Sequence, residues 1–177
     1  ISIPCSVQSI ENGAFAGCSI GEEFFYKCLS LSQFIIPPSS ISINDYAFNL
    51  CSSLVNIKIP LSVRSIGIAA FSGCSMLKQI KLHSNIKEIK NEAFKGCISL
   101  QNIDISSVVS IGSYAFEGCS SLKMISIISL NSIEKYTFCN CTAFTEIFVP
   151  SSVQTIESHA FYGCTSLKHA TISSSVT

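Results

Sequence analysis

Apolar and polar residues alternate in short groups along the chain, and each group is followed by further apolar residues at wider spacing. Ile57 and Ile59, for example, are two positions apart, so both side chains point to one side of a strand while that of Lys58 points to the other. The same alternation recurs along the chain. It predicts short strands at 34–36, 57–59, 80–82, 103–105, 125–127, 147–149 and 170–172.

A phenylalanine followed three residues later by a cysteine marks each repeat of this pattern. From the second pair on, successive phenylalanines are 23, 23, 23, 22, 22 and 23 residues apart. A fixed period of this length indicates one supersecondary unit copied in series, which is the organisation of a solenoid. The pairs are Phe15/Cys18, Phe25/Cys28, Phe48/Cys51, Phe71/Cys74, Phe94/Cys97, Phe116/Cys119, Phe138/Cys141 and Phe161/Cys164.

The rest of each repeat predicts a turn, a second extended piece and an inward-facing segment. Proline closes the strand in three repeats, as at Pro60, where the loss of an amide donor does least harm. A second extended piece follows at 63–66, and the Ala-Phe-x-x-Cys spacing then suits one helical turn facing inward. In the two 22-residue repeats Ser106 and Ile128 replace the proline, so length varies in a turn while the apolar positions are kept.

The complete unit resembles the BspA-like type of leucine-rich repeat. The resemblance rests on the string Leu-x-x-Ile-x-Ile-Pro-x-Ser-Val-x-x-Ile-Gly-x-x-Ala-Phe-x-x-Cys-Ser-Ser-Leu, which residues 60–77 and 105–122 match closely. It implies a leucine-rich-repeat solenoid, a right-handed coil with a parallel concave β-sheet and with short strands or helical turns on the convex side. It also implies cell-surface proteins of mucosal bacteria and protists that take part in adhesion to host cells or matrix proteins.

The whole chain, residues 1–177, is expected to form one domain of such repeats, with a defect near its start. Phe15 and Phe25 are only 10 residues apart, so the repeat at about 19–28 is truncated, whereas regular repeats run from about 29 to 172. We expect a break in the concave sheet between Ile3 and Leu31, and looser packing of residues 1–27. Because the chain begins inside a strand-like segment and ends within a repeat, we also expect it to be part of a longer solenoid.

Composition and charge narrow the function. The chain has 11 basic and 11 acidic residues and a formal net charge of zero. The sequence has no basic stripe, so nucleic acid is not expected as a partner. It is 47% hydrophobic with a mean hydropathy of +0.47, yet no apolar run approaches the roughly 18 to 20 residues of a membrane span. Short apolar groups of this kind indicate buried strands, and no membrane segment is expected in this chain.

Eight of the ten cysteines occupy one repeat position, so stacking places them in a single file. Cysteine is small and often fully buried, which favours a ladder of free thiols over disulfides between turns. A zinc site is the third alternative, but the only closely spaced pair is Cys139 and Cys141, and no metal or cofactor is expected. Cys5 and Cys139 lie outside the file and are expected to be the exposed or reactive pair.

Catalysis is not expected. The sequence has no nucleotide-binding or nucleophile motif, and His83, His159 and His169 fall at unrelated repeat positions, as surface histidines do. His169 has no partner carboxylate at a predictable distance in the sequence. These observations predict a protein without enzymatic activity.

The resemblance directs attention to the outward residues of the strands, which line the concave face in leucine-rich repeats. A run of amides occupies the first outward position of four repeats, and apolar Met124, Ile128 and Phe148 lie further along. The predicted protein-binding residues are Gln33, Ile35, Asn56, Lys58, Gln79, Lys81, Asn102, Asp104, Met124, Ser126, Glu146, Phe148, His169 and Thr171.

These features predict a non-catalytic module that binds proteins through its concave face. The partner implied by the resemblance is a host extracellular-matrix or cell-surface protein or glycoprotein, bound by an adhesin or surface antigen at the cell surface. The alternative is an intracellular protein-interaction scaffold, in which a ladder of unpaired thiols is equally stable.

Overall fold

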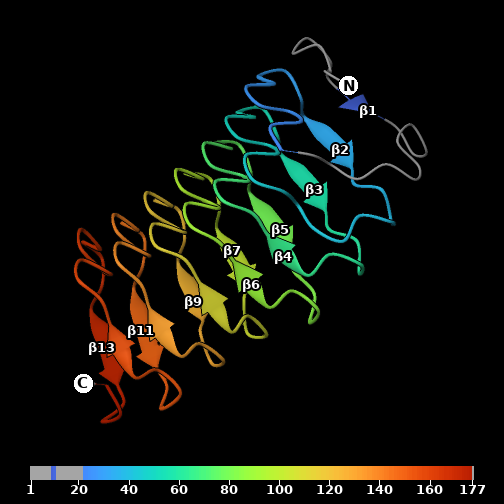
Figure 1. Ribbon diagram of the computed structural model, residues 1–177. Coiled ribbons are helices and arrows are strands. Elements are labelled where there is room, and N and C mark those ends of the chain that lie inside the picture. The colour runs from blue at the N-terminus through green and yellow to red at the C-terminus, as the bar shows by residue number, and fades with distance from the viewer. Residues whose placement is uncertain (1–8, 11–21, 177) are drawn as a thin grey trace.

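The computed structural model describes residues 9–10 and 22–176, and in these residues it forms a β-solenoid without a helix. Successive turns of 22 or 23 residues stack along one axis, with the N-terminal and C-terminal turns at opposite ends (Figure 1). The stacking places the same repeat position of neighbouring turns side by side. Each position therefore becomes a column that runs along the molecule.

The first strand of each turn contributes to a parallel sheet along one side of the coil (Figure 1). The register is regular: Asn56 pairs with Gln79, and Lys58 pairs with Lys81. β11 and β13 form a separate parallel pair that continues beyond β9 (Figure 1). The strands are β1 (Ser9–Ile10), β2 (Gln33–Ile35), β3 (Asn56–Lys58), β5 (Gln79–Lys81), β7 (Asn102–Asp104), β9 (Met124–Ser126), β11 (Glu146–Val149) and β13 (His169–Ile172).

The second extended piece of each turn forms shorter parallel ladders. Ile66 pairs with Ile89, and Ile89 pairs with Ile111, so these isoleucines form one buried column. Residues 63–66 were expected to be extended, and the strand within them confirms this. The strands are β4 (Ser65–Ile66), β6 (Glu88–Ile89) and β8 (Ser110–Ile111) in one sheet, and β10 (Ser132–Ile133) and β12 (Thr155–Ile156) in another.

The Ala-Phe-x-x-Cys segments are turns, so the expectation of a helical turn is wrong in the described residues. The residue before the alanine and the residue before the cysteine have positive φ, as Glu92 (59°) and Gly96 (70°) show. Two left-handed residues within five positions interrupt a right-handed helix. The backbone amides bond alternately to the next turn, as from Phe94 N to Ala115 O at 2.8 Å, and to a carbonyl three residues back, as from Cys97 N to Phe94 O at 3.1 Å.

The phenylalanines of these segments form a continuous stack through the core. Neighbouring ring centroids are 5.1 to 5.7 Å apart from Phe25 to Phe161, and the rings are within 17° of parallel. The rings from Phe25 to Phe138 are fully buried. This spacing slightly exceeds the roughly 4.8 Å between paired strands, which leaves room for one aromatic ring per turn.

The cysteine file is a ladder of mostly buried thiols, as the sequence predicted, and the eight described cysteines form no disulfide. Each thiol from Cys51 onward donates to the phenylalanine carbonyl of the preceding turn, as from Cys97 Sγ to Phe71 O at 3.1 Å. Burial raises the pKa of the Cys97 thiol well above its usual value, and the neighbouring Cys74 raises it further. The same bond is made by Cys51, Cys74, Cys119, Cys141 and Cys164.

Cys139 is buried, with 3% of its surface exposed, so the expectation that it is exposed is wrong. It follows the stacked Phe138 and lies in the column of Glu117 and Tyr162 of the adjacent turns. Burial raises the pKa of its thiol, and the nearby Glu117 raises it further. A protonated, covered thiol is a poor nucleophile. Cys5, its expected counterpart, lies outside the described residues.

The start of the coil is more regular than predicted, as far as it is described. β1 pairs with β2 in the parallel register Ser9 to Gln33, so the sheet has a neighbour beyond β2. Phe25 is fully buried, and its amide bonds to Ala47 O at 2.8 Å, as in the later turns. Phe25 thus has the burial and the bond to the next turn that the regular repeats have, and looser packing of residues 22–27 stays a prediction. The predicted strand around Ile3 lies outside the described residues.

Candidate functional site: the concave face

The exposed residues of the first-strand sheet form two neighbouring columns, which we call the concave face. In β2, β3, β5 and β7 the middle residue is buried and the two flanking residues are exposed. Alternation along a strand produces this division, because successive side chains point to opposite sides. All fourteen residues that the sequence predicted for this face are exposed.

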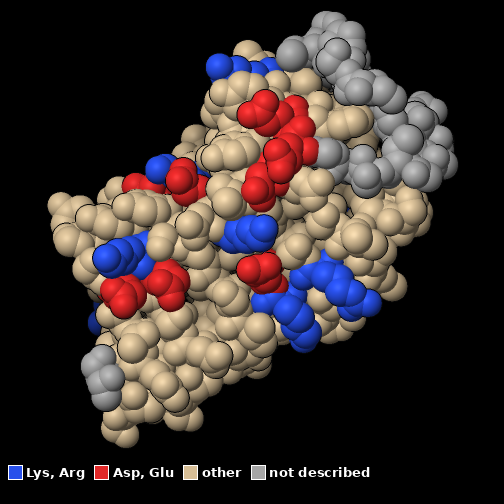
Figure 2. Space-filling model, viewed as in Figure 1, with Lys and Arg blue, Asp and Glu red and all other residues tan. Residues whose placement is uncertain are grey.

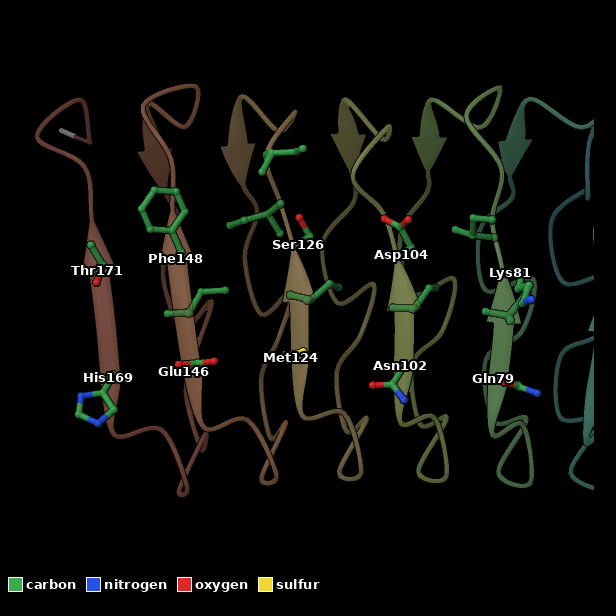
Figure 3. A pocket seen from close by; sticks show the side chains of 17 residues that line it. Gln79, Lys81, Asn102, Asp104, Met124, Ser126, Glu146, Phe148, His169 and Thr171 are labelled. Carbon is green, nitrogen blue, oxygen red and sulfur yellow. The ribbon is translucent and has the colours of Figure 1, made fainter.

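A hollow of about 850 Å³ occupies the C-terminal part of the concave face, from β5 to β13. Figure 3 shows the side chains of its labelled residues projecting from five successive strands. The other four predicted residues, Gln33, Ile35, Asn56 and Lys58, lie on β2 and β3 outside it. Ten predicted residues line it: Gln79, Lys81, Asn102, Asp104, Met124, Ser126, Glu146, Phe148, His169 and Thr171.

Amide side chains form the first column at its N-terminal end. Gln33, Asn56, Gln79 and Asn102 are successive register partners, so one amide lies on each of four neighbouring strands. Each carries both a donor and an acceptor. The column can therefore hydrogen-bond to a polar chain that crosses the strands, and it changes character at Met124, the register partner of Asn102.

The second column contains two lysines on adjacent strands. Lys58 and Lys81 are register partners, and both are exposed. In the part of the chain that the structure describes, the ion pairs within 4.0 Å involve only Lys95, so neither concave lysine has a carboxylate partner there. Like charges placed directly opposite each other destabilise a sheet. Asp104 follows Lys81 in the same column, but no ion pair within 4.0 Å joins these two described side chains.

Asp104, the next residue in that column, forms a hydrogen bond with the turn that follows its own strand. The backbone N–H of Ser106 donates to Asp104 Oδ1 at 2.9 Å, and this bond lowers the pKa of Asp104. Ser106 stands where other repeats have proline. The carboxylate thus stabilises a turn that lacks the conformational constraint of a proline ring. Asp104 therefore has a structural role and is also exposed on the concave face.

The C-terminal end of the hollow is apolar. Met124, Ile128 and Phe148 have between 55% and 61% of their surface exposed, and all three line the hollow. Figure 3 places Phe148 on the strand next to Met124. Exposed aromatic and large aliphatic side chains that adjoin one another are typical anchors of protein interfaces.

The sequence did not predict that Glu146 and His169 are neighbours on this face. Glu146 is the register partner of His169, so the histidine does have a carboxylate on the adjacent strand, and the statement that no partner is predictable is wrong. The 23-residue repeat would have found it, because residues one period apart become neighbours after stacking. No ion pair within 4.0 Å joins the two described side chains.

The opposite side of the coil carries an aromatic row that the sequence reasoning also missed. Tyr114 stacks on Tyr136 and Tyr136 on His159, with ring centroids 4.8 Å apart in both pairs. Lys95 Nζ lies 5.2 Å from the centre of the Tyr114 ring and 3.0 Å from Glu117 Oε2. The signal was the spacing of 22 and 23 residues between these aromatic positions.

Charge is sparse and mixed over the molecule. Figure 2 shows Lys and Arg interspersed with Asp and Glu in small groups on the viewed face. Partial burial, the largest single influence on Lys95, lowers its pKa, but hydrogen bonds with Glu117 and Glu92 outweigh it, so the pKa is raised.

The described residues contain no group of three or more His, Cys, Asp or Glu that could hold a metal ion. Nor do they include a helix with the length and apolar character that crossing a membrane requires.

Solved structures with the same fold come from bacteria. A leucine-rich repeat protein from Bacteroides ovatus is 36% identical with a TM-score of 0.86, and the match covers 89% of this chain and 42% of that one. A leucine rich cell surface protein from Faecalibacterium prausnitzii is 29% identical with a TM-score of 0.77, covering 96% of this chain and 46% of that one. The chain thus spans less than half the length of these relatives.

A more distant structure and the sequence comparisons complete the assignment. The pneumococcal vaccine antigen PcpA, 19% identical with a TM-score of 0.50 over 96% of this chain and 57% of its own, shares the fold alone. No curated protein sequence matches the chain. The model of the BspA type leucine rich repeat region matches residues 1–20, 19–129 and 66–177. The chain therefore belongs to the BspA-type leucine-rich-repeat family.

Proposed function

We propose that this chain is a non-catalytic protein-recognition module of a cell-surface adhesin or surface antigen, which binds host or matrix proteins through its concave face. The observation that carries the proposal is the contrast within each strand. The middle position of the strand is apolar in every turn and buried in most of them, whereas the outward positions change from amide to lysine, aspartate, methionine, glutamate and phenylalanine. A fixed scaffold that displays a varied, partly apolar surface suits protein recognition.

The surface location rests on the relatives. One of them, from Faecalibacterium prausnitzii, is described as a cell surface protein. Because this chain spans less than half of that protein, its location and partner are part of the proposal. The lack of catalysis rests on the family and on the hollow, where the single histidine, His169, faces a single carboxylate, Glu146, without an ion pair between them.

Binding to a panel of purified extracellular-matrix glycoproteins, immobilised and probed with the purified chain, tests the proposal. The concave variant combines Lys58→Ala, Lys81→Ala and Phe148→Ala, and we expect it to weaken binding at least tenfold, because an aromatic anchor and two cations are lost together. A matched control removes one exposed aromatic residue and two cations elsewhere, at Tyr162, Arg64 and Lys135. Equal binding by the two variants contradicts a concave site.

An intracellular scaffold is the second candidate, because cysteines without disulfides are compatible with the reducing cytosol. Surface biotinylation of intact cells that produce the full-length protein separates the two. Labelling supports the surface assignment. A protein that is labelled only after lysis is a scaffold.

A further inference from the structure

We propose that the concave face binds one extended polypeptide segment that crosses the strands, with acidic side chains at Lys58 and Lys81 and an apolar side chain against Met124, Ile128 and Phe148. This inference deepens the proposed function and rests on it. It specifies the chemistry of the bound segment and the distance between its two anchors.

The pair of lysines, Lys58 and Lys81, is the reason for proposing acidic side chains at one end of the bound segment. Lys58 and Lys81 stand on adjacent strands about 4.8 Å apart and point to the same side. Neither forms an ion pair within 4.0 Å among the described side chains, although Asp104 is the column neighbour of Lys81. Like charges on adjacent strands oppose stability, and local features of this kind mark functional positions. A carboxylate between them, or two on consecutive residues, relieves the repulsion.

The apolar end follows from three exposed side chains at the far part of the hollow. Met124 on β9 and Phe148 on β11 are on neighbouring strands, and Ile128 follows β9 and lines the same hollow. Together they offer a surface for one aromatic or large aliphatic side chain. Ser126 occupies the position between Asp104 and Phe148 in one column, and Glu146 follows Met124 in the other, so carboxylates border this apolar surface on both sides.

The geometry fixes the separation of the two anchors. β5, which carries Lys81, and β11, which carries Phe148, are three strands apart through β7 and β9 (Figure 3). Three strand spacings amount to about 14 Å, which an extended peptide covers in roughly four residues. Over this stretch Gln79, Asn102 and Ser126 face the segment and can hydrogen-bond to its backbone or to small polar side chains. The carboxylate of Asp104, between Lys81 and Ser126, can accept hydrogen bonds from backbone amides of the segment.

The combination favours a polypeptide over an anionic glycan. A sulfated or carboxylated sugar chain satisfies the lysines but offers no side chain for Phe148, Met124 and Ile128. Acidic and apolar groups on one chain at a defined distance are a property of peptides. A heparin-derived hexasaccharide is therefore the appropriate competing probe, and its binding must be independent of Phe148.

Peptides labelled with fluorescein test the spacing in fluorescence anisotropy. The spaced peptide is Glu-Glu-Ser-Ser-Ser-Ser-Phe-Leu, and its compact isomer is Ser-Ser-Glu-Glu-Phe-Leu-Ser-Ser, each also made in the reverse order. In at least one chain direction we expect the spaced peptide to bind about tenfold more tightly than its isomer, because only it reaches both anchors. Equal affinities in both directions overturn the proposal, as does a hexasaccharide that binds more tightly than every peptide.

Charge exchange tests the acidic end. The variant with Lys58→Glu and Lys81→Glu is expected to lose the spaced peptide and to bind the analogue that has Lys-Lys in place of Glu-Glu, with affinities exchanged to within about threefold. The control, Arg64→Glu with Lys135→Glu, changes the net charge equally and keeps the original preference. A folded exchange variant, checked by circular dichroism, that binds neither peptide overturns the proposal.

The two proposals fail in different ways. If the concave triple variant loses its matrix partner but the peptides show no dependence on spacing, the proposed function stands and this inference is wrong. If that variant keeps its matrix partner, the concave face is not the binding site, and both are wrong.

Discussion

The buried columns and the concave face are made of adjacent residues, yet they obey different rules. Ile57 and Lys58 share one strand, but Ile57 continues a column of buried aliphatic residues while Lys58 adjoins a second lysine. The inner columns repeat one chemistry in each turn, because a ring or thiol must match the ring or thiol of the next turn. The outer columns carry no such constraint. In this solenoid, stability is therefore concentrated inside the coil, and recognition is left to the outer columns.

The largest expected change in the free energy of unfolding comes from removing one ring of the phenylalanine stack. Phe94 is fully buried between Phe71 and Phe116, at 5.4 and 5.3 Å. Phe94→Ala is expected to lower the free energy of unfolding by about 3–5 kcal/mol, measured by urea denaturation, because it leaves a cavity between two turns. Phe148→Ala on the concave face should change it by no more than about 0.5 kcal/mol. Comparable losses in both variants contradict the division.

Alkaline pH should destabilise the inner columns selectively. Burial raises the pKa of the Cys74, Cys97 and Cys119 thiols well above the unfolded value of about 8.5. Because the folded pKa is the higher one, the stabilisation is complete below pH 8.5 and is lost as the pH rises above it. Each such thiol contributes a slope of up to about 1.4 kcal/mol per pH unit.

The measurement is the free energy of unfolding between pH 8 and 10, in the parent and in Cys97→Ala. Removing one thiol should make the decline shallower by the slope of one proton, whatever the variant does to stability at pH 7. A decline of the same slope in both proteins indicates that the thiols do not control it.

Ser40 offers a test in the stabilising direction. It occupies the buried column in which later repeats have Val63, Ile86, Val108, Leu130 and Val153, and its hydroxyl has no hydrogen-bond partner among the described residues. Ser40→Val is expected to raise the free energy of unfolding by about 1 kcal/mol, since it removes an unsatisfied polar group and adds apolar contacts. Ser40→Ala, which removes the hydroxyl without adding volume, separates the two contributions. A loss of stability in both variants indicates that the hydroxyl is satisfied in solution.

The smallest expected effect concerns the lysine pair. Replacing Lys81 with alanine relieves the repulsion with Lys58, so thermal unfolding at low salt should show a gain of about 0.5 kcal/mol. The gain should shrink at 0.5 M salt, because exposed charges are screened. Lys135→Ala, at an exposed position without a paired lysine, is the control. A loss of stability on replacing Lys81 means that its side chain makes a stabilising contact.

The sequence predicted the inner columns well because stacking imposes a strict period. The alternation around Ile57 gave the strand and its exposed neighbours, and the Phe-x-x-Cys spacing gave the ring stack and the thiol ladder. It did not predict the left-handed residues, since Glu92 and Tyr114 are not residue types that favour positive φ, and the bonds between turns impose it. The repeat spacing alone also did not predict that Cys139 is buried, because its burial depends on the residues of adjacent turns. The concave residues were located correctly, and their role is a proposal.

The hydrogen bonds between turns have a consequence for how such a protein changes in length. The thiol of Cys97 contacts Phe71 of the previous turn, and that of Cys74 contacts Phe48, in the same way and at the same distance of 3.1 Å. A duplicated segment running from one ladder cysteine to the residue before the next would therefore insert with both of its junctions already complementary. Each such duplication lengthens the displayed surface by one rung of about 4.8 Å without requiring a new interface. Recombination between repeats can thus alter the reach of the surface in whole steps while the interior remains unchanged.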